Sequence, residues 1–569
     1  MTTSPLRSAF DVDRLIGTVC EVAGTTVKLN LPRAATTSAA SHHGGRVDGG
    51  QVGEYVVIES GRFALFGKVV LVRLPERERL TVEPGSARSD AHPIGTVQLL
   101  ANADLVTGRV SVGLIRFPRL GERVFSAHPD VVIAMTCGSH AVDADGVSLD
   151  IATLSDLGAT VSVTPESLFG RHCAVVGSTG GGKSWTVARL IEQMGKHNAK
   201  VVLLDATGEF LPLTTSVRHI HIGTSQGEPQ TSENVSVPYH QLTVDDLFAI
   251  FKPGGQSQSP KLRLAIKTLK IAALEPSVGS SGVVHKAGQL KSKLSQAYKK
   301  HQAAVDGPGA RFDINKLAEQ IDLECVWRDD KSGDPKRWGG VQENDRSYCA
   351  GLINRVEEIV HAPEMACVMQ PGALRSFGEA LDEFFKDGEV RTLRVSMQHV
   401  PFAHSAREIV ANTIGRHLLA LGRTGAYKSK PLLVVVDEAH QFFGKSIGDE
   451  YTRCTLDAFE LIAKEGRKYA LTLCIATQRP RDITEDVLSQ MGTLIVHRLV
   501  NDSDREVVER ATSSLDASAS GFLPSLGQGE ALIVGAAFTV PLMVQMMAPT
   551  EPPESRGPDY QTHWKIVPA

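Results

Sequence analysis

Residues 173–194 read CAVVGSTGGGKSWTVARLIEQM, and this stretch decides the fold of the central part of the chain. Its first four residues are apolar and predict a buried strand, while the segment from Trp185 to Met194 has the pattern of an amphipathic helix. Between them, GSTGGGKS at 177–184 matches the phosphate-binding pattern GxxxxGK[ST] in full. A strand, a glycine-rich loop and a helix in this order predict a nucleotide-binding α/β domain.

The residue types of this loop suit the binding of ATP and Mg²⁺. Glycines let the backbone wrap phosphates closely, and the amides of the loop and of the helix N-terminus donate to phosphate oxygens. We expect Lys183 to reach the β and γ phosphates and Ser184 to ligate Mg²⁺. The alternative is a glycine-rich turn with an accidental lysine. The residues assigned to the nucleotide are Gly177, Ser178, Thr179, Gly180, Gly181, Gly182, Lys183 and Ser184.

A second motif, PLLVVVDEAH at 431–440, predicts a central strand that ends in two carboxylates. Asp437 is expected to support the magnesium ion, and Glu438 to polarise the water that attacks the γ phosphate. A buried strand that ends in two acids is a weak signal by itself. Downstream of a complete phosphate loop it predicts ATP hydrolysis, and a Glu directly after the metal-binding Asp resembles the additional-strand P-loop ATPases.

Two further polar residues are candidates for the same chemistry. Gln478 ends the next predicted strand, LCIAT, where an amide side chain is placed to sense the γ phosphate or orient the water. Arg467 lies near the end of a predicted helix, where it suits an arginine finger acting on the phosphate of a neighbouring subunit. The alternatives are a polar residue that merely ends a strand, and a solvent-facing cation favoured by the helix dipole.

The chain is too long for one hydrophobic core, since 569 residues exceed the roughly 250 to 300 at which a single core stops growing. Short β-rich runs between glycine-containing turns predict a small β-barrel at residues 1–140. Near-continuous apolar strands alternating with helices predict an α/β core of 141–214 and 391–548, with a parallel sheet covered on both faces. Residues 215–390 are expected to form a mainly α-helical insertion, and 549–569 a C-terminal tail.

The composition argues against several classes of protein. Sixty basic and 64 acidic residues give a net charge of −4, so the whole molecule has no cationic field that would attract nucleic acid or lipid. Eight scattered cysteines without metal-site spacing indicate reduced thiols. The N-terminus lacks a secretory signal, and the apolar window from Ala531 to Pro549 is interpreted as two strands and not a membrane span. We therefore expect a cytoplasmic protein with no membrane contact.

One segment departs from the acidic average. Residues 261–301 hold nine Lys or Arg, at positions 261, 263, 267, 270, 286, 291, 293, 299 and 300, against the single acid Glu275. It is the best local candidate for contact with DNA phosphates, without reading of the base sequence. The alternative is a solvated face of the helical insertion.

Several motifs together resemble the HerA family of hexameric DNA-translocating ATPases, which is related to the FtsK motors. The N-terminal runs IGTV, VKLNL, VGEYVVIE and LFGKVV look like the HAS-barrel of that family. The motifs that carry the resemblance are GSTGGGKS, VVLLDATGEF, LLVVVDEAHQFF, IAKEGRKY, IATQRPRDITEDVLSQMGTLIVHRLVNDSD and LGQGEALIVG.

The resemblance implies roles for individual residues. Lys183 and Ser184 would bind Mg·ATP, and Asp437 would support the metal. Glu438 would be the catalytic carboxylate and Arg467 the trans-acting finger. The remaining assignments are Gln478 as the coupling residue, with Asp205 and Glu209 in supporting roles near the nucleotide. The sequence departs from the commonest family pattern at Lys464, where an arginine is usual before Glu465, which leaves Arg467 as the better finger candidate.

The resemblance also implies an assembly and partners. The family's active form is a homo-hexamer with ATP between subunits and double-stranded DNA through the central channel. Its usual partner is a NurA-like nuclease in DNA end processing, and some relatives pair with an NADase or nuclease effector in antiphage defence. The alternative function is an ATP-regulated scaffold that switches such an effector without substantial translocation. A secretion or conjugation motor is disfavoured by the barrel.

Overall fold

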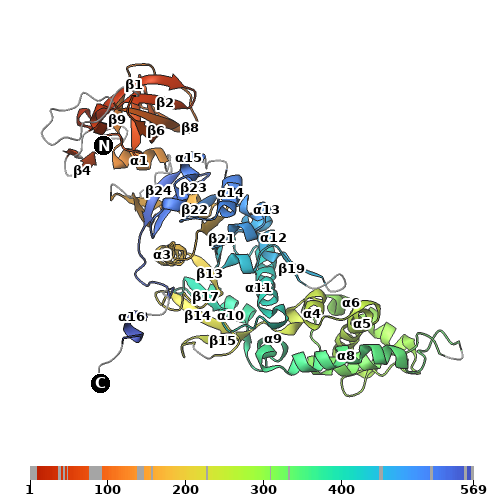
Figure 1. Ribbon diagram of the computed structural model, residues 1–569. Helices are drawn as coiled ribbons and strands as arrows, with labels where there is room; N and C mark the ends of the chain where they lie inside the picture. The colour runs from red at the N-terminus through yellow and green to blue at the C-terminus, as the bar shows by residue number, and fades with distance from the viewer. Residues whose placement is uncertain are drawn as a thin grey trace. The chain divides into compact units, whose positions relative to one another are not determined.

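The computed structural model describes residues 9–35, 40–42, 45–47, 49–75, 93–136, 146–154, 158–225, 228–307, 309–330, 333–447, 453–512, 517–555 and 560–565. The chain folds as two compact units. The first comprises residues 1–197 and 473–569, and the second comprises residues 198–472. The predicted fold class is confirmed: an α/β P-loop ATPase core with an N-terminal β-barrel and a helical segment (Figure 1).

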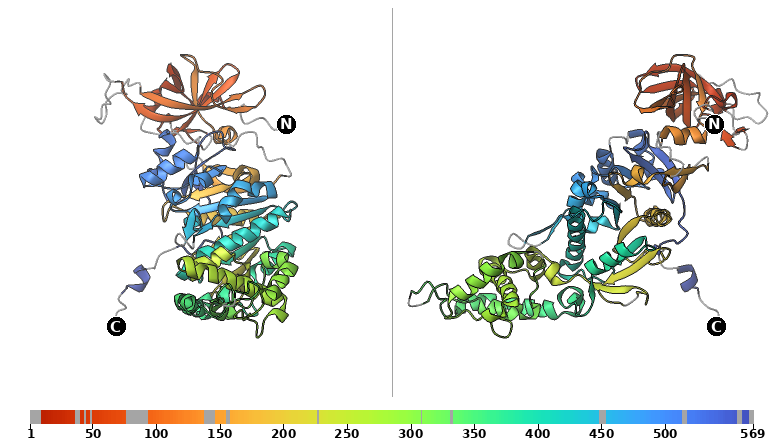
Figure 2. Two further views of the ribbon diagram at one scale, coloured as in Figure 1. Left: turned by 90° about the vertical axis from the view of Figure 1, so that its right-hand side faces the viewer. Right: turned by 180° about the vertical axis from the view of Figure 1, so that it is seen from behind.

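The N-terminal part of the first unit is a closed β-barrel. Its strands pair in the order β1, β9, β5, β6, β7 and β2, and the pairing of β2 with β7 closes the ring. Alternate side chains such as Val27 and Leu29 point inward and are fully buried. Figure 2 shows the barrel strands from two further sides. The bounds are β1 (Leu15–Ala23), β2 (Thr26–Asn30), β5 (Tyr55–Ser60), β6 (Phe63–Arg73), β7 (Ile94–Asp104) and β9 (Arg123–Ser126).

Shorter elements flank the barrel. Strand β8 (Val110–Val112) extends it at β7, and β3 (Ala40–His42) pairs with β4 (Gly45–Val47) in a separate hairpin. Helix α1 (Pro129–Thr136) follows β9. The chain then enters the α/β core.

The sheet of the first unit carries the phosphate loop. Strand β12 (Cys173–Val176) lies between β21 (Leu471–Thr477) and β22 (Thr493–Val496), parallel to both. From β22 the sheet continues antiparallel through β23 (Glu530–Gly535), β24 (Leu542–Met546), β10 (Leu149–Leu154) and β11 (Thr160–Val163). The helices are α2 (Pro165–Phe169), α3 (Lys183–Gly195), α13 (Glu485–Leu488), α14 (Asp502–Ala511) and α15 (Ala517–Ser520).

Two expectations about this unit can be compared with the structure. The apolar window from Ala531 to Pro549 forms the antiparallel pair β23 and β24, as predicted. None of the helices in the described ranges is long and apolar enough to cross a membrane. The predicted C-terminal tail, 549–569, contains the short helix α16 (Tyr560–His563).

The second unit contains a parallel sheet. Its order is β18 (Leu432–Val436), β13 (Lys200–Asp205), β17 (Thr392–Ser396), β14 (Val217–Ile222), β15 (Glu233–Ser236) and β16 (Arg375–Ser376). Every described residue of β13, β17 and β18 is buried, as expected for strands that are covered on both faces. Helices α10 (Phe377–Lys386), α11 (Ala406–Arg423) and α12 (Ala458–Glu465) and the hairpin of β19 (Lys445–Ile447) with β20 (Cys454–Leu456) complete this part.

The helical segment lies between β15 and β16, so the parallel sheet reaches into the predicted insertion range of 215–390. Strand β14 reads VRHIHI, whose polar residues hide a buried strand from a search for apolar runs. His221 is buried because its ring nitrogens contact the hydroxyls of Ser232 and Ser225, at 2.9 and 3.0 Å. The helices of the segment are α4 (Val244–Phe251), α5 (Gly255–Leu274), α6 (Lys291–Asp306), α7 (Leu317–Leu323), α8 (Glu343–His361) and α9 (Ala366–Met369).

Candidate nucleotide site

The phosphate loop spans Gly177 to Gly182 and joins β12 to α3. Gly180 and Gly182 have φ of +76° and +114°, conformations that side chains with a Cβ rarely adopt. Gly182 is the N-cap of α3, so the first amides of this helix are directed into the loop. Lys183 is almost buried, and its Nζ lies 3.4 Å from the carbonyl oxygen of Ser178. The ammonium group therefore points across the loop, where phosphate oxygens would bind.

His497 forms the floor of the loop, a role that the sequence analysis did not assign. A Cβ on Gly177 would come within 2.5 Å of the Cβ of His497. The His497 ring is buried, with Nδ1 2.9 Å from the carbonyl oxygen of Glu530 and Nε2 2.8 Å from the hydroxyl of Thr186 on α3. Burial lowers the pKa of His497 to about 4. The ring is therefore neutral at pH 7, donates from Nδ1 and accepts from Thr186.

Gln478 contacts the loop directly. Its Oε1 accepts a hydrogen bond from the hydroxyl of Thr179 at 2.5 Å. The residue follows β21, which is the parallel neighbour of β12, so both strands deliver their carboxyl ends to the same edge of the sheet. The structure thus brings Gln478 together with the phosphate loop, as its predicted sensing role requires.

The second unit gathers four carboxylates. Asp437 and Glu438 follow β18, and Asp205 and Glu209 follow the neighbouring strand β13. Asp437 is buried, and burial together with the charges of Asp205, Glu438 and Glu209 raises its pKa well above the usual value. Burial is the largest cause of the raised pKa of Asp437 and the neighbouring negative charges add to it, so a cation nearby would stabilise the charged form.

Asp205 is fully occupied by hydrogen bonds within the chain. Its Oδ1 accepts from the amide of Gly208 at 2.8 Å, and its Oδ2 accepts from the amide of Phe210 at 3.1 Å. The Oδ2 atom also accepts from Nε of Arg394 at 2.7 Å, and both side chains are fully buried. Asp205 therefore shapes the turn that carries Glu209, and Arg394 on β17 holds it there.

Glu438 has a strained backbone. Its φ is +46°, in the left-handed region that non-glycine residues seldom occupy, and such strain concentrates at functional sites. The Oε2 atom of Glu438 lies 3.1 Å from Nδ1 of His440, two residues further along. The Oε2 atom is buried and has no hydrogen-bond partner among the described residues, so it is left available for a ligand or a water molecule.

The donor types fit Mg²⁺. Magnesium prefers oxygen ligands and is usually bound through one or two protein groups together with phosphates and water. The Ser184 hydroxyl in the first unit is one such group. In the second unit the Asp437 carboxylate is another, and its raised pKa indicates that a cation would relieve its environment. Within the described ranges there is no group of three or more His, Cys, Asp or Glu residues arranged around a metal position. A cation here would depend on the nucleotide for its other ligands.

Arg467 is exposed on the 3₁₀ helix Gly466–Tyr469 that follows α12. Among the residues that the structure describes, no hydrogen bond or ion pair involves its guanidinium. The neighbouring Glu465 is instead paired with Arg423, at 3.0 Å. The guanidinium of Arg467 is therefore exposed to solvent.

The basic segment 261–301 is largely neutralised by the fold. The sequence counts one acid within it, yet the structure brings acids from outside to its cations. Five of the nine basic residues take part in ion pairs, namely Lys261 with Asp345, Arg263 with Asp245, Lys286 with Glu324, Lys291 with Asp329 and Lys300 with Glu275. The segment is therefore not one continuous cationic face.

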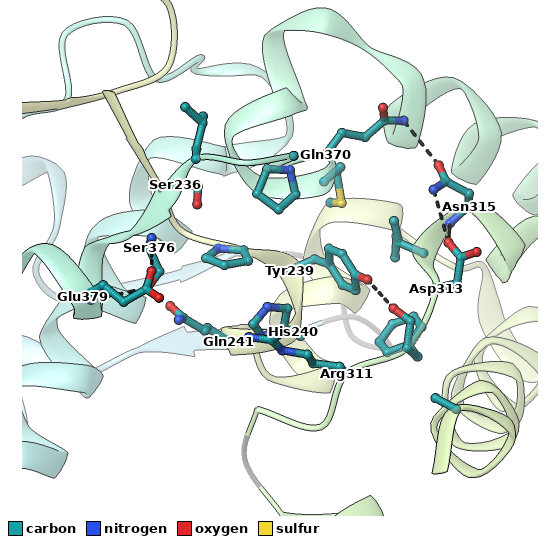
Figure 3. Close-up of a pocket in the computed structure, with 18 residues that line it drawn as sticks. Ser236, Tyr239, His240, Gln241, Arg311, Asp313, Asn315, Gln370, Ser376 and Glu379 are labelled. Atoms are coloured by element: carbon teal, nitrogen blue, oxygen red, sulfur yellow. Dashed lines mark hydrogen bonds between the residues drawn. The ribbon is translucent and has the colours of Figure 1, made fainter. Parts of the chain in front are cut away.

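A cavity of about 740 Å³ lies elsewhere in the second unit, between the end of β15, the start of α7 and the region around α9 and β16 (Figure 3). None of the predicted nucleotide residues lines it. The Glu379 carboxylate at one side is engaged in capping α10 through Ser376, and the Tyr239 hydroxyl donates to the carbonyl of Phe312. These contacts account for much of its polar lining structurally.

In the first unit, β12, the glycine-rich loop and α3 form a phosphate-binding loop. In the second unit, the parallel strand β18 is followed by two acidic residues. These two features define a P-loop ATPase. The family model described as helicase HerA, central domain, matches residues 149–314, and that described as helicase HerA-like C-terminal matches residues 419–560. The chain belongs to the HerA family and is an ATP-hydrolysing enzyme.

The chain is also similar to individual proteins that are named as helicases. The chain is 27% identical over 470 residues to the DNA double-strand break repair helicase HerA of Pyrococcus furiosus, covering 80% of this chain and 77% of that protein. It is 24% identical over 399 residues to the protein of the same name in Sulfolobus acidocaldarius, covering 69% and 68%. A probable helicase of Methanocaldococcus jannaschii is 25% identical over 399 residues, covering 68% of each chain.

Solved structures are more distant. The structure of VirB4 of Thermoanaerobacter pseudethanolicus aligns with a TM-score of 0.43 and 14% identity, covering 72% of this chain and 98% of that one. The plasmid coupling protein TrwB in complex with a non-hydrolysable ATP analogue aligns with a TM-score of 0.41 and 14% identity, covering 71% and 91%.

The contact between Gly177 and His497 predicts the effect of one added methyl group. Gly177→Ala should weaken ATP binding at least about tenfold, because the new Cβ must displace the loop or the histidine beneath it. Gly195→Ala is the matched control, since a Cβ at that end of α3 meets nothing within 4 Å. Titration with a fluorescent ATP analogue checks both variants, and wild-type affinity in Gly177→Ala would contradict the role of this contact.

The raised pKa of Asp437 predicts a gain in stability on its neutralisation. Asp437→Asn should raise the melting temperature of the nucleotide-free protein, by roughly 2–4 °C per kcal/mol gained, and should abolish ATP hydrolysis. The gain should be larger at pH 8 than at pH 5, because wild-type Asp437 takes up a proton as the pH falls through its raised pKa. Calorimetry beside the exposed-site control Asp130→Asn tests this, and a lower melting temperature at pH 8 would refute it.

Proposed function

We propose that this chain is an ATP-driven motor that translocates on or unwinds double-stranded DNA as a homo-hexamer. The observations that carry the proposal are the formed phosphate loop of the first unit and, in the second unit, the buried Asp437 and the strained backbone of Glu438. The printed names of the relatives assign DNA double-strand break repair to those proteins. Work on DNA ends beside a nuclease, or in antiphage defence beside an NADase or nuclease effector, is the setting that this motor would fit.

The proposed chemistry is phosphoryl transfer to water. The loop amides and Lys183 bind the β and γ phosphates of ATP. Ser184 and Asp437 would hold Mg²⁺, which would supply charge neutralisation at the phosphates. Glu438 accepts the proton of the attacking water as the new P–O bond forms and the bond to ADP breaks. Gln478, which already contacts Thr179, reports the state of the γ phosphate to β21.

The exposed Arg467 supports the proposed ring of subunits. Arg467 is exposed, and a guanidinium supplied by the next subunit stabilises charge on the transferred phosphoryl group. Identical head-to-tail interfaces close into a ring when the rotation between subunits permits. Weak phosphate contacts that repeat around the channel then add up. A single subunit has a net charge of −4 and would make too few such contacts to hold DNA by itself.

Removal of the Glu438 charge tests the hydrolytic step. Glu438→Gln keeps the size of the side chain but cannot accept the water's proton, so turnover should fall by about 10²–10⁴-fold while ATP still binds. Steady-state phosphate release and ATP titration measure the two effects separately. Glu358→Gln, an exposed site on α8, is the matched control. Normal turnover in Glu438→Gln would remove the assigned base.

Duplex DNA should stimulate the ATPase. At low salt we expect the rate to rise several-fold on addition of linear duplex, and the stimulation to fade as salt displaces phosphate contacts. Lys183→Ala serves as the blank for contaminating ATPases. Equal rates with and without duplex at low salt would contradict the motor and would favour the scaffold that switches an effector.

A further inference from the structure

The helical segment of the second unit contains an aromatic pocket. A cavity of about 550 Å³ lies between α5, α6 and the segment 324–342. Three aromatic side chains line it: Tyr298 from α6, and Trp327 and Trp338. Two of the four tryptophans of the chain thus meet at one site. The sequence of the basic segment shows only Tyr298, so it is the fold that brings the tryptophans to the basic helices.

Backbone pairing places the two tryptophans. The amide of Trp327 donates to the carbonyl of Gly340 at 3.0 Å, and the amide of Gly339 donates to the carbonyl of Trp327 at 2.9 Å. A Cβ on Gly339 would lie 2.7 Å from the Cβ of Trp327, so the glycine permits this close pairing. Trp327 nevertheless remains 50% exposed, although hydrophobic side chains of this size are mostly buried.

A rigid polar network supports the pocket. Lys286 and Glu324 are both buried and paired at 2.5 Å, and Lys286 also donates to the hydroxyl of Thr268 at 3.1 Å. The other Glu324 oxygen accepts from Thr268 and from Gln320, at 2.8 and 3.1 Å. The network satisfies its own hydrogen bonds, so it offers no strong code for reading one base against another.

Two further cations line the pocket and do not belong to this network. Lys267 lies with its Nζ 3.5 Å from the centroid of the Tyr298 ring, and it takes part in no ion pair among the described residues. Arg328 is exposed next to Trp327 and, within the same described ranges, is likewise without an ion pair. These two charges remain after the fold has neutralised most of the basic segment.

We propose that this pocket binds an unpaired nucleobase of single-stranded DNA, stacked on Trp327, with the flanking phosphates on Lys267 and Arg328. An exposed aromatic ring beside cations that form no ion pair among the described residues is the arrangement by which proteins hold single strands without reading sequence. The site does not involve the ATPase motifs, so it goes beyond the proposed duplex motor. It gives the helical segment a role at frayed or resected DNA ends.

The experiment measures binding of fluorescein-labelled (dT)₂₀ to the full-length protein by anisotropy. Trp327→Ala should weaken binding about tenfold, the loss typical of one stacked base, and Trp327→Phe should restore most of it. The double variant Lys267→Glu with Arg328→Glu should also weaken binding and flatten its salt dependence. The matched control, Lys293→Glu with Lys299→Glu, reverses two exposed charges of α6 that do not line the pocket.

The outcomes separate this site from the motor. The proposal expects the control to bind (dT)₂₀ far better than the pocket charge variant, and all variants to keep the wild-type ATPase rate without DNA. Unchanged affinity in Trp327→Ala would overturn it. Equal losses in the control and pocket charge variants would also overturn it, since they would indicate a diffuse electrostatic surface. If the wild-type protein binds (dT)₂₀ but does not hydrolyse ATP, the result would count against the proposed function and not against this site.

Discussion

The burial of Asp437 is the constraint on which the second unit depends. The Asp437 carboxylate has almost no exposed surface and lies next to the charges of Asp205, Glu438 and Glu209. Burial and these charges outweigh the hydrogen bond that it accepts from the Glu438 amide. Arg394 pairs with Asp205 at 2.7 Å and with Glu228 at 3.6 Å. The remaining negative charge at this edge of the sheet favours a cation.

The phosphate loop, the acid pair and the fold class could be predicted from the sequence because each depends on local residues. Glycines at 180 and 182 are required by their φ angles, and LLVVVD predicts a buried strand from its composition. The closed barrel was predictable for the same reason, from short strands and glycine turns. Gln478 was predictable because the end of a parallel strand lies at the same edge as its neighbour's.

The features that could not be predicted from the sequence depend on contacts between residues far apart in the chain. His497 supports the loop from a position 320 residues after Gly177, and nothing in its own neighbourhood indicates that. His221 is a buried polar residue of β14, where polar side chains weaken the apolar pattern that locates strands. The surroundings of the basic segment were also not predictable from its own sequence. Asp245, Asp329 and Asp345, which lie outside the segment, form ion pairs with its cations, and Trp327 and Trp338 add an aromatic site to it.

The central claim is that each nucleotide site is completed by the next subunit. The most direct measurement is the ATPase rate of rings formed by co-expressing Lys183→Ala and Arg467→Ala chains, each of which alone should be inactive. Where an Arg467→Ala subunit supplies the intact phosphate loop and a Lys183→Ala neighbour supplies the arginine, the site is whole. Random equal mixing predicts recovery of about a quarter of wild-type activity, one intact interface in four. A mixture no more active than the two variants measured separately would contradict the account.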